Sequence, residues 1–157
     1  MNAKFKSIFP NASILCMLAI IIISGGCEDN FDDSEYTEIE FFKFSDFGCD
    51  NDNQWSLNHD YRDELNIINS QTEFDKIIDI ECSPQIDFSK YVVLAGMRGF
   101  STYAFFHDEK VEENNSTIVY TVSFAVTDAT SLSAVSYYVI IDKPTGKKKI
   151  KFVESTK

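Results

Sequence analysis

The stretch STIVYTVSFAVT, residues 116–127, decides the fold class. One face of this stretch carries the apolar side chains of Ile118, Tyr120, Val122, Phe124 and Val126. Period-two alternation of this length is typical of a half-buried antiparallel strand. Asn114 and Asn115, just before it, favour a tight turn because asparagine tolerates a positive φ angle. We therefore expect a hairpin with the preceding alternating segment, Ser101–Glu109.

Other segments also have strand patterns. Val135–Ile141 is aromatic and β-branched, Lys149–Val153 alternates lysine with apolar residues, and Pro144–Gly146 between them is a turn signal. We expect these two segments to form a second hairpin that closes the chain. Tyr91–Ala95 is a continuous apolar run, which indicates a central strand buried on both faces, and Leu65–Ile68 has the pattern of a short strand.

One helix is expected, beginning at Ser70. Ser70 and Glu73 form a capping box, in which Ser70 accepts from the N3 amide and Glu73 reaches back to the cap amide. An apolar stripe at helical spacing follows, formed by Phe74, Ile77 and Ile78, and Ser83-Pro84 should end the helix. The predicted fold is mainly β (α+β): a single antiparallel β-sandwich or open barrel with one packed helix, over residues 39–157.

The charge of the chain excludes some partners. The chain has 157 residues, typical of one domain. Lys4 and Lys6 are the only charges before Cys27, so 12 basic residues (14 less 2) stand against 25 acidic ones from there on, a net charge of −13. Nucleic-acid binding needs basic side chains that neutralise phosphates, so nucleic acid is not an expected partner. The same charge argues against electrostatic docking on anionic lipid.

The first 26 residues have the pattern of a signal peptide. Ile14–Ile23 is an uncharged apolar run of ten residues, too short for the roughly 20 residues of a membrane-spanning helix but typical of the apolar region of an export signal. Three small residues then precede Cys27, with Ser24 where leucine is usual and the aliphatic residue one place earlier, at Ile23. This site resembles the lipobox of bacterial lipoproteins. The alternative is an ordinary cleaved signal with Cys27 free or paired.

The lipobox resemblance implies that the Cys27 thiol is diacylglycerated, that the signal is removed before it, and that the new amino terminus is acylated. Two or three acyl chains hold a protein durably on a membrane. Residues 27–38 would then be an acidic lipidated tether, similar to the acidic export signal of surface-exposed lipoproteins in some Gram-negative groups; the alternative is a simple solvated linker. The implied location is the cell envelope, as an outer membrane lipoprotein, since Glu28 rather than aspartate after the cysteine is not typical of retention at the inner membrane. The acidic segment adds display on the cell surface as one option, and the sequence does not determine which leaflet receives the anchor.

A second resemblance covers about residues 67–153. INSQTEFDKII (68–78), IDFSKYVVLAG (86–96) and IIDKPTGKKKIKFV (140–153) are similar to the C-terminal domain of PrcB-type protease-complex accessory subunits, and still more to small Gram-negative lipoproteins. These motifs are structural, so the resemblance implies a fold more than an activity. The Gly-Gly-Tyr usual after the buried strand of the protease-subunit type is absent here, where the chain has Gly99–Tyr103.

Two cysteines remain once Cys16 is removed with the signal and Cys27 is acylated. Cys49 and Cys82 form an even pair in an exported protein, which favours a disulfide. The bond would tie the segment Asp46–Asn58, expected to be irregular, to the end of the helix. The alternative is two buried or reduced thiols.

The sequence offers no catalytic group, metal site or cofactor motif that we would assign. His59 and His107 are the only histidines, no serine lies in a Gly-x-Ser-x-Gly elbow, and both histidines have the surroundings of solvated surface residues. Asp50–Gln54 is rich in oxygen ligands but lacks the glycine and glutamate of a calcium loop. The aromatic residues before the helix suit either core packing or recognition: Phe41, Phe42, Phe44, Phe47 and Trp55.

These features predict a lipid-anchored cell-envelope lipoprotein that acts as a non-enzymatic binding or accessory module. Its expected partners are the membrane, through the anchor, and an envelope protein or glycan. The alternative implied by the family resemblance is a protease inhibitor or protease-complex subunit. A hydrolase of unfamiliar type is a third possibility, which a pocket with convergent carboxylates and His59 or His107 would favour.

Overall fold

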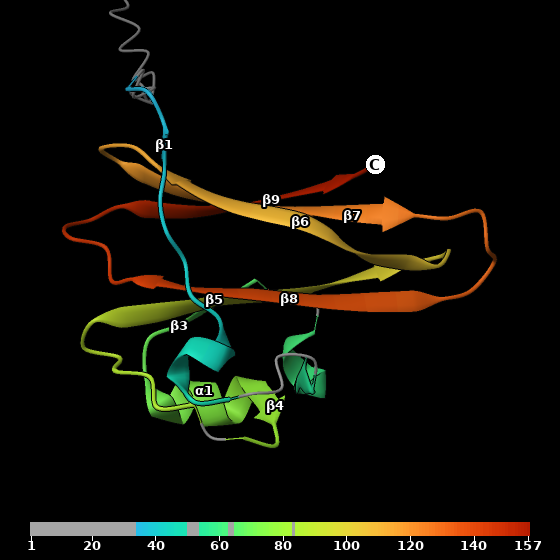
Figure 1. Ribbon diagram of the computed structural model, residues 1–157, viewed down its shortest axis with the longest axis horizontal. Coiled ribbons are helices and arrows are strands. Elements are labelled where there is room, and N and C mark those ends of the chain that lie inside the picture. Colours follow the sequence, from blue (N-terminus) through green and yellow to red (C-terminus); the bar gives the residue numbers. More distant parts are fainter. Residues whose placement is uncertain (1–33, 50–53, 63–64, 83) are drawn as a thin grey trace, which may run out of the picture. The chain divides into compact units, whose positions relative to one another are not determined.

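A computed structural model describes residues 34–49, 54–62, 65–82 and 84–157 (Figure 1). Within these ranges, short elements come first and five longer strands follow. The short elements are β1 (Thr37–Glu38), η1 (Phe44–Phe47), β2 (Trp55–Leu57), η2 (His59–Tyr61), β3 (Asn66–Ile68), α1 (Gln71–Ile77) and β4 (Ile78–Ile80). The longer strands are β5 (Tyr91–Phe100), β6 (Ala104–Glu113), β7 (Thr117–Val126), β8 (Ser133–Asp142) and β9 (Lys149–Thr156).

The strands form three sheets. A four-stranded sheet has the order β1-β6-β7-β9, a three-stranded sheet has the order β3-β5-β8, and β2 pairs with β4. The two larger sheets face each other, and α1 lies on the other side of the three-stranded sheet (Figure 1). The fold is therefore mainly β, a sandwich with one packed helix and not a closed barrel, which confirms the predicted fold class.

The stretch 116–127 supplies β7, in the interior of the four-stranded sheet. The predicted apolar face is buried from Ile118 to Phe124, while Val126 at the strand end is 37% exposed. β7 pairs with β6 in the predicted hairpin. The turn is made differently from the prediction, because only glycines have a positive φ among the described residues. Instead the Asn114 side-chain oxygen accepts from the N–H groups of Ser116 and Thr117, at 3.0 and 2.8 Å.

In the three-stranded sheet, β5 and β8 are buried on both faces over most of their length. In β5, Val92 and Leu94 belong to the core between the two sheets, whereas Val93 and Ala95 belong to the core beneath α1. β8 alternates in the same way, so that Tyr137 lies in the first core and Tyr138 in the second. The predicted doubly buried central strand is confirmed. The aromatic residues before the helix also pack on these cores, so core packing accounts for them.

The predicted closing hairpin is wrong. β8 pairs with β5 in the three-stranded sheet, and β9 crosses to the other sheet to pair with β7 in parallel. The physical reason is the number of apolar faces. Val135–Ile141 is apolar on both faces and suits the middle layer, but β9 has one apolar face, with Ile150 and Phe152 inward and its lysines outward. A strand with one apolar face is satisfied at the edge of a two-layer sandwich.

The helix is shorter than expected. Its N-cap is Ser70, as predicted, with the Ser70 hydroxyl accepting from the Glu73 N–H at 3.2 Å. The second half of the predicted capping box differs, because the Glu73 carboxylate accepts from the N–H of Asn69, one residue before the cap, at 2.8 Å. It ends at Ile77, well before Ser83-Pro84, and Ile78 is already extended. The next residues alternate apolar and acidic and form β4, which pairs with β2. β2 lies inside the segment Asp46–Asn58, which was expected to be irregular. Strand pairing therefore outweighs the helical spacing at Ile78.

Residues 37–43, which we call the strap, join the two larger sheets along one long side. At its start, β1 pairs with the last two residues of β6, and the Ile39 N–H donates to the Val111 carbonyl at 2.9 Å. A few residues later Phe42 exchanges two hydrogen bonds with Ile140 of β8, at 2.8 and 3.0 Å. The strap therefore pairs with the edge of both sheets. β1 itself belongs to the segment 27–38 expected to be a tether.

Candidate functional site

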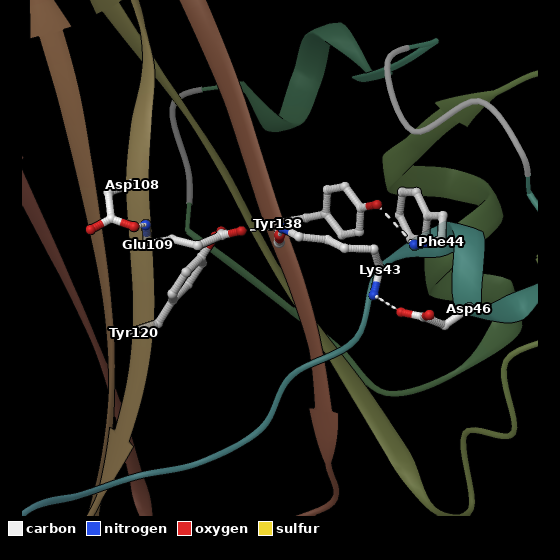
Figure 2. A network of polar contacts seen from close by, with 7 residues as sticks. All are labelled: Lys43, Phe44, Asp46, Asp108, Glu109, Tyr120 and Tyr138. Atoms are coloured by element: carbon white, nitrogen blue, oxygen red, sulfur yellow. Dashed lines mark hydrogen bonds and ion pairs between the residues drawn. The ribbon is translucent and has the colours of Figure 1, made fainter.

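A buried ionic network lies on the strap side of the sandwich (Figure 2). Glu109 of β6 has a side chain only 6% exposed, and its two carboxylate oxygens are bonded to different partners. Lys43 of the strap forms an ion pair with one, and the Tyr120 hydroxyl donates to the other at 2.6 Å. The Lys43 ammonium also donates to the Tyr138 carbonyl at 2.8 Å. We call Lys43, Glu109 and Tyr120 the strap-side clasp.

The end of the strap is held just as firmly. The Phe44 N–H donates to the Tyr138 hydroxyl at 2.8 Å, and the two rings stack with centroids 3.8 Å apart. The Lys43 N–H donates to the Asp46 carboxylate at 2.7 Å, and its ammonium lies 4.7 Å from the Tyr138 ring centroid (Figure 2). These contacts attach the strap and η1 to β8.

The clasp is suited to structure more than to acid–base chemistry. Burial, followed by the charge of Glu109, raises the pKa of the Tyr120 hydroxyl well above its ordinary value. The phenol therefore keeps its proton and remains a donor. Because both oxygens of Glu109 already accept hydrogen bonds, the carboxylate is committed to holding Lys43 and Tyr120 in place.

A second network lies on the opposite long side. Glu154 of β9 accepts from Arg98 of β5 at 2.8 Å and from the Tyr137 hydroxyl of β8 at 2.5 Å. Burial and the hydrogen bond to Glu154 raise the pKa of Tyr137. We call Arg98, Glu154 and Tyr137 the β9-side clasp. Gly96 lies opposite Tyr137 in the β5–β8 pair, and a Cβ atom there would be 2.4 Å from the hydroxyl, so glycine leaves room for the ring.

The structure brings together one of the pairs expected from the sequence. Cys49 and Cys82 lie in disulfide geometry, with Cα atoms 5.6 Å apart. The pair joins the residue after the η1 C-cap to the segment after β4, so it fastens the short elements into one layer. Cys27, the expected lipid attachment site, and Asp50–Asn53 lie outside the described residues.

The two histidines are not brought into a common site. His59 lies in η2 with its side chain 89% exposed, and its nearest charged partner is the equally exposed Asp60. His107 is an exposed residue at the irregular position where the β6–β7 register shifts. The described residues hold no group of three or more histidine, cysteine or acidic side chains placed to bind a metal ion. None of the helices in the described part of the chain is long and apolar enough to cross a membrane.

A hollow of about 410 Å³ lies beside the strap, at the end of the sandwich where β1 pairs with β6. Its lining mixes both charge signs: Glu40, Glu113, Asp142, Lys143 and Lys148. Lys148 is paired with Glu113 at 2.6 Å, and Lys143 donates to the Phe88 carbonyl at 3.0 Å. Both lysines line the hollow, but each is already bonded to another group.

The opposite end of the sandwich is apolar and exposed. Five large apolar side chains, 37–86% exposed, gather where β5 turns into β6 and β7 leads into β8: Tyr103, Phe105, Phe106, Val126 and Leu132. We call these residues the apolar tip. Phe105 and Phe106 lie on opposite faces of β6, so the apolar surface wraps around that strand, and the Tyr103 and Phe105 ring centroids are 6.3 Å apart. In soluble domains, large exposed apolar patches are often interaction sites.

The two connections that build the tip are hydrogen-bonded to each other. Tyr103 donates its N–H to the Ala129 carbonyl at 3.0 Å and accepts from the Thr127 N–H at 2.9 Å. The Ser133 hydroxyl donates to the Thr102 carbonyl at 2.8 Å and accepts from the Ala104 N–H at 3.0 Å. The apolar side chains are therefore presented on a backbone held by defined bonds, which lowers the ordering cost of binding.

Sequence reasoning missed this tip, although one signal was present. Residues 99–106 and 129–141 contain no charged residue, in a chain where 25% of residues are charged. The sequence analysis placed strands at Ser101–Glu109 and Val135–Ile141, within or beside these stretches. Periodicity alone does not show which end of a strand extends beyond the sheet that covers it.

Comparisons with known protein families, with curated proteins and with solved structures found no match to this chain.

Proposed function

We propose that this protein is a lipid-anchored lipoprotein of the cell envelope, held by Cys27, whose β-rich domain is a non-enzymatic binding module. The apolar tip is its contact surface for a partner protein. The anchor rests on the sequence: the short apolar run 14–23, the small residues before Cys27, and the acidic segment that follows. The outer membrane is the location that this pattern supports best.

The observation that carries the binding role is the contrast between the tip and the rest of the surface. The core of a protein–protein interface is depleted in charge and enriched in aromatic residues. The tip has this composition, with Asp128 as the one charge between Gly99 and Phe106 or between Ala125 and Ile141. A sugar-binding surface would need more polar groups to bond hydroxyls. We therefore favour a protein over a glycan.

The position of the tip fits a tethered module. β1 pairs with Glu112 and Glu113, at the end of β6 farthest from Phe105, so the described chain begins at the other end of the sandwich. The tip therefore lies at the end of the sandwich away from the first described residues.

Site-specific photo-crosslinking in intact envelopes tests the binding role. A photoreactive residue at Leu132, which is 86% exposed, should give one crosslinked protein. The matched control is the same probe at Thr145, an exposed position beside the hollow, at the end of the sandwich where β1 pairs with β6. The additional substitution Phe105→Asp should abolish the crosslink while leaving the melting temperature unchanged. Equal crosslinking from both positions, or a crosslink that survives Phe105→Asp, would contradict the proposal.

Mass spectrometry of the purified native protein tests the anchor separately. We expect the chain to begin at Cys27 with a diacylglyceryl group on its sulfur and an acyl group on its amino terminus. An intact Met1, or an unmodified sulfur at Cys27, would rule out the lipoprotein assignment. The role as a protease inhibitor or protease-complex subunit stays a prediction from family resemblance, and an inhibition panel with the full-length chain would test it.

A further inference from the structure

The long side of the sandwich opposite the strap has an open strand edge. β9 is the outermost strand of the four-stranded sheet. The Lys149 N–H bonds to the Ser116 carbonyl and the Lys157 N–H to the Phe124 carbonyl, so the odd-numbered residues direct their backbone groups toward β7. Because these directions alternate along a strand, Ile150, Phe152 and Glu154 direct theirs outward. No described residue forms a backbone hydrogen bond with this outer edge.

An exposed apolar shelf lies on the same side. The strap joins the β8 and β6 edges, so β3 and β9 are the opposite edges of the two sheets. Ile67 of β3 pairs with Leu94, whose side chain lies in the core between the sheets. Ile67, and Leu65 two residues before it, therefore face the four-stranded sheet, yet they are 41% and 50% exposed. One more strand beside β9 would lie over them.

The outer face of this edge is positively charged. Lys149 and Lys151 point away from the core, both are exposed, and neither has an ion-pair partner within the described ranges. Five of the 12 basic residues after Cys27 fall within residues 143–151, in a chain that is otherwise strongly acidic. Two copies joined through β9 would place lysine against lysine, so charge disfavours a second copy at this edge.

We propose that β9 accepts an added strand from a partner protein, an extended segment in which acidic and apolar residues alternate. The backbone of the segment pairs with the outward groups of Ile150, Phe152 and Glu154. Its acidic side chains lie beside Lys149 and Lys151, and its apolar side chains cover Leu65 and Ile67. Strand addition of this kind draws affinity from main-chain hydrogen bonds and specificity from alternate side chains. This edge is separate from the apolar tip, so the inference does not depend on the proposed function.

Amide exchange measured by NMR on the full-length chain in detergent micelles tests the proposal. The probe is an acetylated ten-residue peptide of alternating glutamate and valine, and the control peptide has lysine in place of glutamate. Binding of the glutamate peptide should slow exchange at Ile150, Phe152 and Glu154. The amides of Lys149, Lys151 and Val153, already bonded to β7, should change little.

Charge reversal tests the recognition. Lys149→Glu with Lys151→Glu should weaken binding of the glutamate peptide on the order of tenfold, since two attractive cross-strand pairs become repulsive. Lys76→Glu with Lys90→Glu changes the net charge equally at exposed positions elsewhere and should leave binding unchanged. Equal affinity for the lysine peptide, binding without protection of the three outward amides, or no binding would overturn the proposal. In that case the lysines only guard an edge strand against aggregation.

Discussion

The two long sides of the sandwich have similar hydrogen-bonded ion pairs, but the strap covers one side and no described segment covers the other. On each side a glutamate of the four-stranded sheet accepts from a buried tyrosine and pairs with a cation. Glu109, covered by the strap, is 6% exposed, whereas Glu154, on the uncovered edge strand, is 25% exposed. An ion pair contributes according to how completely water is excluded from it. The strap side should therefore be the stronger structural element, and the β9 side the one free to bind.

The largest loss of stability is expected from removing the disulfide, which joins the short elements that follow the strap into one layer. Replacing Cys49 and Cys82 together by serine should lower the free energy of unfolding by about 3–4 kcal/mol, because the unfolded chain regains the freedom of a loop of this size. Urea unfolding measures the change. Reduction of the unsubstituted protein should produce a similar loss, and no effect of reduction on the double-serine variant is the control. A loss below about 1 kcal/mol would mean that packing alone holds this layer.

Glu109→Ala should lower the free energy of unfolding by about 3 kcal/mol. This is the lower end of the range for a broken buried ion pair, because the Lys43 side chain is itself 30% exposed. The variant leaves the Tyr120 hydroxyl and the Lys43 ammonium without their carboxylate. Glu113→Ala on the same strand is the control, since that glutamate is 35% exposed and should cost under about 1 kcal/mol. Equal costs at the two positions would remove the distinction between covered and open ion pairs.

Alkaline pH should destabilise the fold through the two buried tyrosines. The pKa of Tyr120 and that of Tyr137 are raised in the folded state, so the unfolded chain loses these protons first, near the ordinary value of about 10. Stability from these groups is fully present below that pH. It should fall as pH rises above it, by about 1.4 kcal/mol per tyrosine per pH unit. Urea unfolding between pH 9 and about 11 checks this, and Tyr120→Phe and Tyr137→Phe should each remove their share of the slope.

Glu154→Ala should lower the free energy of unfolding by only about 1 kcal/mol, the smallest of these effects, because Arg98 and Glu154 are both partly solvated. The cost should shrink in high salt, which screens exposed pairs more than buried ones. Thermal unfolding at low and high salt compares it with Glu109→Ala. A cost at Glu154 as large as that at Glu109 would show that the β9 side is as closed as the strap side.

Part of this architecture could be predicted because it depends on neighbours in the sequence. Alternation marked the buried face of β7, the doubly apolar run marked β5, and the spacing of Ser70 and Glu73 marked the helix cap. The Cys49–Cys82 pair was predicted differently, from the even number of cysteines expected after signal removal and acylation, and the structure brings the two together. Periodicity and capping are local properties, so residues within a few positions determine them.

Only the tertiary structure decided which strands pair and which surfaces stay uncovered. The short turn between β8 and β9 predicted a hairpin. In the structure β8 lies between two layers, where both of its apolar faces are buried, and β9 pairs with β7 in the other sheet. Ile78 is in a strand and not in the helix, because it pairs with Leu57 of β2. The apolar tip and the open β9 edge arise in the same way. Exposure depends on what the rest of the chain covers, and a sequence pattern shows only which face of a strand prefers to be covered.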